Sequence, residues 1–141
     1  MKANFRAWDK TTNQMRGCYG FNDMEREVYV CSVADDEFNG QLETVHALKR
    51  SFDEVVLMQS SGVKDVNDKE IFEGDYLSII VFESQKEYRG EVIFHKGSFC
   101  ISIKDYQNPY EILLHGVGNI NYLLNVLGNV YEDPELIDTK S

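Results

Sequence analysis

Short segments in which apolar and polar residues alternate dominate the second half of this chain. The clearest is 98–104, where Phe99, Ile101 and Ile103 alternate with polar residues or cysteine, the period of a strand with one buried face. Similar runs at 76–83, 90–95, 110–114 and 126–131 are separated by polar turns and glycines, and seven of the ten glycines follow residue 60. This spacing predicts a small meander or barrel of antiparallel strands.

The run 76–83 is unusual because both of its faces are apolar. Leu77, Ile79 and Val81 would share one face, while Tyr76, Ile80 and Phe82 would share the other. A strand that is apolar on both faces is normally covered on both. We therefore expect another element to pack on the outside of the predicted barrel.

Turn residues mark the ends of several of these strands. Asn67-Asp68 predicts a two-residue hairpin turn, because both residue types tolerate a positive φ. Gly128, inside the closing strand, predicts a bulge or a close backbone approach. Asp133 followed by Pro134 predicts a short terminal helical turn, and a further helical turn is expected within 119–125.

The first 60 residues are less regular. Segments 4–9, 15–21 and 27–33 have strand-like composition. Val45, Leu48 and Phe52 recur at helical spacing, so we expect a short helix or irregular segment at 42–52. The fold class is therefore mainly β, with an N-terminal β-rich (α+β) segment packed on a C-terminal barrel.

Charge narrows the classes of function. The chain carries 14 basic and 24 acidic residues, a net charge of −10. Residues 61–141 hold 7 basic and 14 acidic groups, so this half is the more acidic. An acidic surface repels phosphate backbones, which disfavours simple nucleic-acid binding. The charge serves either solubility or an acidic face that meets a basic partner.

Cysteine and histidine give no metal or cofactor signature. Cys18, Cys31 and Cys100 form no Cys-x-x-Cys pair, and the histidines are isolated, so neither a metal site nor a cofactor is predicted. Neither a signal-peptide pattern nor a membrane-length apolar run is present. We expect a cytoplasmic protein with reduced thiols.

Carboxylates gather around the predicted hairpin. The segment starting at Asp65 begins like a calcium loop, but Glu70 stands where such a loop needs glycine and Tyr76 where it needs glutamate. Solvated turn charges are one interpretation, and a metal-dependent or acid–base enzyme is the alternative. The carboxylates concerned are Asp65, Asp68, Glu70, Glu73 and Asp75.

The single tryptophan lies in a charged segment near the N-terminus. In a strand, Arg6 and Trp8 point to the same side, where the cation can lie against the ring. Trp8 then either anchors the strand or, with Arg6 and Asp9, forms a partner contact, since Trp and Arg are favoured at interface centres.

Three blocks together resemble the YopX family, small proteins of phages and prophages in bacteria. They are 5–9 with Met15, then 58–75, and finally 128–136. At the hairpin tip the family pattern has Asn-Gly, whereas this chain has Asn67-Asp68. The resemblance implies an SH3-like barrel over 61–137, after an N-terminal segment 1–60 and before a tail 138–141. It implies no catalytic residues, and the matched positions look architectural: Gly62, Asp65, Gly74, Asp75, Gly128 and Pro134.

From these features we expect a non-enzymatic phage or prophage protein in the cytoplasm of the bacterial host cell. It would bind a protein partner, either itself as a homo-oligomer or a host or phage protein, and no membrane. A nucleic-acid-associated SH3-like module is the alternative. That alternative needs a basic face formed by Lys86, Arg89, Lys96 and Lys104.

Overall fold

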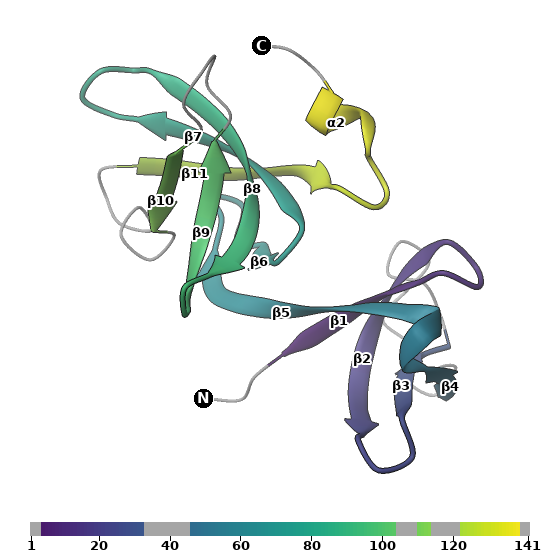
Figure 1. Ribbon diagram of the computed structural model, residues 1–141. Helices are drawn as coiled ribbons and strands as arrows, with labels where there is room; N and C mark the ends of the chain where they lie inside the picture. Colours follow the sequence, from purple (N-terminus) through teal and green to yellow (C-terminus); the bar gives the residue numbers. More distant parts are fainter. Residues whose placement is uncertain (1–3, 33–45, 104–109, 114–121, 139–141) are drawn as a thin grey trace. The chain divides into compact units, whose positions relative to one another are not determined.

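The computed structural model describes residues 4–32, 46–103, 110–113 and 122–138. They are mainly β-strands in two antiparallel sheets (Figure 1). The chain divides into two compact units, unit 1 (Met1–Gln59) and unit 2 (Ser60–Ser141). The predicted β-rich class is therefore confirmed, and each unit is considered by itself.

Unit 1 consists of a four-stranded meander, β1 to β4, and of strand β5, which returns to pair with β1. Its order is β4-β3-β2-β1-β5, and β6 pairs with the last residues of β5, within unit 2. Ala7, Val28, Val30 and Val55 form its buried core, because alternate residues of these strands face one side. The strands are β1 (Phe5–Asp9), β2 (Gln14–Asn22), β3 (Glu27–Cys31), β4 (Ala47–Ser51) and β5 (Val55–Lys64), whose last residues belong to unit 2.

The helix or irregular segment expected at 42–52 is wrong where the structure describes it. Residues 47–51 are strand β4, which pairs along its whole length with β3, and 42–45 lie outside the described residues. Phe52–Glu54 (η3) form one short 3₁₀ turn. Leu48 also fits the alternation of a strand, and pairing with β3 outweighed the helical spacing to Phe52.

Unit 2 holds a five-stranded sheet in the order β10-β9-β8-β7-β11. Its core faces one side of the sheet and consists of Ile71, Leu77, Ile79, Val92, Ile101, Ile103 and Leu124. The predicted barrel does not close among the described strands, since β10 and β11 are the two edges of this sheet. The strands are β6 (Glu70–Phe72), β7 (Asp75–Val81), β8 (Glu87–His95), β9 (Ser98–Ile103), β10 (Tyr110–Leu113) and β11 (Tyr122–Asn129).

The hairpin at residues 65–69 differs from the two-residue turn predicted. Asp68 N–H donates to the Asp65 carbonyl at 3.0 Å, and Asp65 N–H donates to the Lys69 carbonyl at 2.8 Å. Asp68 has φ +65°, whereas Asn67 is not in the left-handed region. Three residues thus connect the strands, in a type I turn followed by one left-handed residue.

The C-terminal segment corrects one expectation and confirms another. The helical turn expected within 119–125 is wrong for 122–125, which belong to β11 and pair with β7; 119–121 lie outside the described residues. The register shifts between Val126 and Gly128, as a bulge requires. The short helix after Pro134 is confirmed as α2 (Glu135–Asp138).

Helix α2 lies against the end of β11 (Figure 1). Gly128 pairs with Tyr76, whose side chain points away from the core, and a Cβ on Gly128 would lie 2.8 Å from Cδ1 of Leu136. Farther along this face Ile80 is half-buried and Phe82 remains 46% exposed. Leu136 thus packs at Gly128 on the neighbouring strand β11, and the outer covering of β7 itself stays a prediction.

Candidate functional site

An aromatic row on unit 1 links three elements that are distant in sequence. Phe5 of β1 and Phe21 of β2 meet edge to face with ring centroids 5.8 Å apart. The ring centroids of Phe21 and Phe52 are 6.2 Å apart. The Arg26 guanidinium carbon lies over the Phe52 ring, 4.9 Å from its centroid. Phe52 also packs on the core of unit 1. The row therefore leads from the core to the surface, where Phe21 is 44% exposed.

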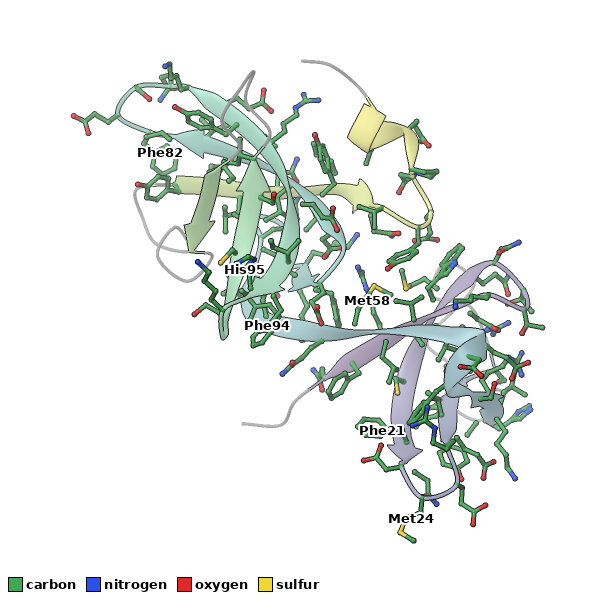
Figure 2. The ribbon with its side chains drawn as sticks, viewed as in Figure 1. Phe21, Met24, Met58, Phe82, Phe94 and His95 are labelled. Atoms are coloured by element: carbon green, nitrogen blue, oxygen red, sulfur yellow. The ribbon has the colours of Figure 1, made fainter. Side chains whose placement is uncertain are left out.

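The β2–β3 tip, residues 21–26, continues this row into solvent. Met24 is 94% exposed and projects from the end of the hairpin (Figure 2). The Asn22 carboxamide oxygen accepts hydrogen bonds from the Met24 and Glu25 N–H groups at 3.0 and 3.3 Å. Arg26 adopts a left-handed φ of +56°, which a non-glycine residue rarely takes. The loop therefore holds Met24 at the apex of an ordered turn.

Sequence reasoning missed this surface. A signal was present, because Met24 stands between Asp23 and Glu25 at the centre of a polar turn-forming segment. An apolar side chain at the apex of a turn has no core within reach, so exposure could have been inferred. Tyr19, 57% exposed, lies two residues before Phe21 on β2.

The first candidate contact, Arg6 with Trp8 and Asp9, is mostly internal. Asp9 is fully buried, Arg6 is 8% exposed and Trp8 is half-buried. Asp9 is surrounded by donors: Arg16 Nε lies 3.0 Å from Oδ2, and Arg50 Nε lies 3.1 Å from Oδ1. Of the three residues, Trp8 keeps the most surface for a partner.

Asp9 is stabilised in its charged form. Burial by itself raises the pKa of a carboxyl group, but hydrogen bonds from Arg50, Thr12, Thr11 and Arg16 outweigh burial, and the pKa of Asp9 lies below its ordinary value. Arg16 also donates to the Cys31 carbonyl and the Gln14 side chain at 3.0 and 2.8 Å. This network joins β1, β2, β3 and β4, so its role is architectural.

Asp65 ties the β5–β6 hairpin to β11. Its Oδ1 accepts the N–H groups of Asn67 and Lys69 at 2.8 and 2.9 Å, and its Oδ2 accepts Val126 N–H at 3.0 Å. Burial opposes ionisation, but these three backbone donors hold the pKa of Asp65 below its ordinary value. Both carboxylate oxygens are therefore used inside the fold.

The other turn positions from the sequence also serve the backbone. Asp75, 1% exposed, accepts Phe72 N–H at 2.8 Å across the turn that contains Gly74. Gly74 and Gly62 adopt φ values of +85° and +80°, which glycine accepts without steric cost. Gly62 lies where the β5–β6 register shifts, between Ser60 and Lys64.

The 128–136 block is a compact capping arrangement. The Asn129 carboxamide oxygen accepts the N–H groups of Tyr131 and Glu132 at 3.0 and 2.8 Å. Asn129 N–H in turn donates a hydrogen bond to Asp133 Oδ2 at 3.2 Å. Pro134 then leads into α2, so this block turns the chain at the end of β11.

The metal-dependent alternative gains no ion site from the described residues, and the basic face of the nucleic-acid alternative is described only in part. Within those residues, no group of three or more His, Cys, Asp and Glu side chains is placed to hold a metal ion. Of the basic face needed for nucleic acid, Arg89 pairs with Glu87 at 3.3 Å, Lys86 and Lys96 are exposed, and Lys104 lies outside the described residues. Nor does any helix in the described part of the chain have the length and apolarity to cross a membrane.

Comparisons with known proteins identify the family. Two solved structures share the fold: protein EF1440 from Enterococcus faecalis, 24% identical with a TM-score of 0.60, and yopX from Bacillus subtilis, 17% identical with a TM-score of 0.59. The first match covers 97% of this chain and 99% of the other, and the second covers 96% and 98%. No curated protein matches the chain. A family model described as YopX protein matches residues 4–138. The chain therefore belongs to the YopX protein family.

Proposed function

We propose that this protein is a non-enzymatic, phage- or prophage-associated protein of the bacterial cytoplasm that acts by binding another protein through the β2–β3 tip. The observation that carries the proposal is the 94% exposure of Met24 beside the partly exposed Phe21. Removing exposed apolar side chains from water on binding a partner is favourable. Methionine and aromatic residues are also enriched where proteins meet.

The buried carboxylates support a binding role over a catalytic one. The metal-dependent alternative relied on the carboxylates of 65–75, yet Asp65 and Asp75 accept backbone hydrogen bonds inside unit 2. A carboxylate engaged in this way would lose its structural bonds on becoming a metal ligand.

The partner in this proposal is either a second copy of the chain or a phage or host protein. A photo-crosslinking amino acid at position 24, introduced in prophage-bearing cells, tests both forms. Position 66 is the matched control, because Val66 is an exposed apolar residue on unit 2, 53% accessible.

We expect crosslinked adducts from position 24 and not from position 66. Adducts between two copies, with a matching mass by light scattering, would support the homo-oligomeric form. Adducts with a different protein would support the heteromeric form. Equal or absent crosslinking at the two positions would overturn the proposed surface.

An SH3-like character of unit 2 is part of the same proposal. Its support is the docking of the β5–β6 hairpin on β11, where Val66 N–H donates to the Leu124 carbonyl at 2.8 Å. The sheet of unit 2 is strongly curved, and β8 bends along its length (Figure 1). The contact between the hairpin and β11 would bring this curved sheet towards a closed barrel. Slow hydrogen exchange at the Val66 and Val126 amides would support it, and exchange as fast as in an open loop would contradict it.

A further inference from the structure

We infer that the β2–β3 tip takes a basic segment of another protein that carries a large apolar side chain, rather than a second copy of this chain. The inference rests on the proposed function and names the partner's chemistry. It follows from how charge is distributed around Met24, the most exposed large apolar residue of the described chain.

The cations near the tip are already committed to other groups. The Arg26 guanidinium lies over the Phe52 ring at 4.9 Å. Lys49 Nζ pairs with Glu27 at 3.3 Å, and Arg50 is bound to Asp9. Each of these cations therefore has a close partner outside residues 23–25, while Arg26 and Lys49 themselves stay exposed.

The anions beside Met24 form no such close pairs within the described residues. Asp23 and Glu25 flank Met24 directly and are exposed, and no basic side chain of the described residues forms an ion pair with either carboxylate. The tip thus combines an apolar apex with two exposed negative charges, of which Glu25 also interacts electrostatically with Lys49. Its complement is an apolar side chain flanked by lysine or arginine.

Self-association through this tip would bring like charges together. In a two-fold dimer the same patch meets itself, so the acidic pair Asp23 and Glu25 of one copy would come close to the same pair of the other. The net charge of −10 adds to that repulsion, whereas it attracts a basic partner at long range. Met24 suits such a partner because its flexible thioether adapts to different apolar shapes.

The test uses the full chain with methyl-labelled methionine and three synthetic peptides. One peptide alternates lysine and leucine, the second replaces each lysine by glutamate, and the third replaces each leucine by serine. The Met24 methyl group reports binding, while the buried Met15 and Met58 report whether the fold is intact. We expect the lysine–leucine peptide to shift the Met24 signal and to bind more weakly as salt rises.

A charge-reversal variant and a matched control sharpen the test. Glu25→Lys should weaken the lysine–leucine peptide about tenfold at low salt. Glu83→Lys makes the same charge change on an exposed loop of unit 2 and should leave the affinity nearly unchanged. Met24→Ser should weaken binding while keeping its salt dependence.

Several results would overturn the inference. They are equal binding of the glutamate–leucine peptide, equal binding of the lysine–serine peptide, equal loss of affinity in Glu25→Lys and Glu83→Lys, or crosslinks at position 24 only between copies of this chain. Crosslinks at position 24 to a different protein, combined with any of the three peptide results, would leave the proposed function standing and remove only the basic partner. Absence of crosslinks at position 24 would remove both.

Discussion

Arg50 reaches across two intervening strands to hold Asp9. Its Nε lies 3.1 Å from Oδ1 and 3.2 Å from Oδ2 of the fully buried carboxylate. Arg50 belongs to β4 and Asp9 to β1, with β3 and β2 between them in the sheet. Such a contact requires a strongly curled sheet, and it fixes that curl because Asp9 also binds Arg16 of β2.

Removing the Arg50 charge should therefore destabilise unit 1. Arg50→Gln leaves the buried Asp9 with one arginine, and we expect the free energy of unfolding to fall by about 2 kcal/mol, as for a lost charge-assisted hydrogen bond. Lys49→Gln on the same strand is the control, because Lys49 pairs with Glu27 in solvent and should change little. Urea unfolding measures the loss in free energy of unfolding for both variants. Similar losses would contradict the proposed stabilising role of the Arg50–Asp9 ion pair.

Asp65 should be essential to unit 2 through its acceptor oxygens. Asp65→Asn replaces one oxygen by a donor, so the Val126 N–H or the Asn67 and Lys69 N–H groups lose an acceptor. We expect a loss of about 2–3 kcal/mol in the free energy of unfolding. Asp68→Asn, in the same hairpin but exposed, should have little effect. The prediction fails if the two substitutions cost the same.

A side chain at Gly128 should require its neighbours to shift. A Cβ there would lie 2.5 Å from Asp133 Oδ2 and 2.8 Å from Leu136 Cδ1, so Gly128→Ala must shift the ends of these side chains and disturb the hydrogen bond from Asn129 N–H to Asp133. We expect a loss of about 1–3 kcal/mol. Gly17→Ala is the control, since no atom lies within 4 Å of the added Cβ. Thermal unfolding of both variants measures the difference, and an unchanged melting temperature in Gly128→Ala would refute the close approach.

Asp68 occupies the left-handed position where glycine is favoured. Asp68→Gly should stabilise unit 2 slightly or leave it unchanged, because glycine adopts φ near +65° freely but loses more entropy on folding. Asp68→Val should lower the free energy of unfolding by about 1–2 kcal/mol relative to Asp68→Gly. Denaturant titration compares the two, and equal stability would argue against a left-handed residue here.

Stability should fall in acid because of Asp9 and Asp65. Both have pKa values below the ordinary value, so the folded chain binds protons at these groups less readily than the unfolded chain. Their contribution is complete above the ordinary aspartate pKa of about 4 and is lost as the pH drops through the folded-state values. Unfolding free energies measured from neutral pH downwards should decline below about pH 5. Asp65→Asn should give a shallower decline, and parallel profiles would exclude Asp65 as a source.

The local sequence pattern was enough to predict most strands of unit 2 and its turn residues. Phe99, Ile101 and Ile103 alternate so regularly that strand β9 follows from residue spacing alone. Gly128 marked the β11 bulge for a similar reason, since a glycine inside a strand pattern often indicates a bulge. Where spacing was ambiguous, as around Leu48 and Phe52, the choice between helix and strand depended on β3, which lies far away in sequence.

The candidate site depended almost wholly on tertiary structure. The sequence predicted Asp9 and Trp8 as contact residues, yet Asp9 is buried and bound by Arg50 of β4. The most exposed large apolar residue of the described chain is instead Met24, at the apex of a turn. The sequence by itself determined the family, the β-rich class and the acidic charge, because these follow from composition and local periodicity. Only the tertiary structure decided which charges are paired and which apolar residues remain in water, because pairing and burial depend on strands brought together from distant parts of the chain.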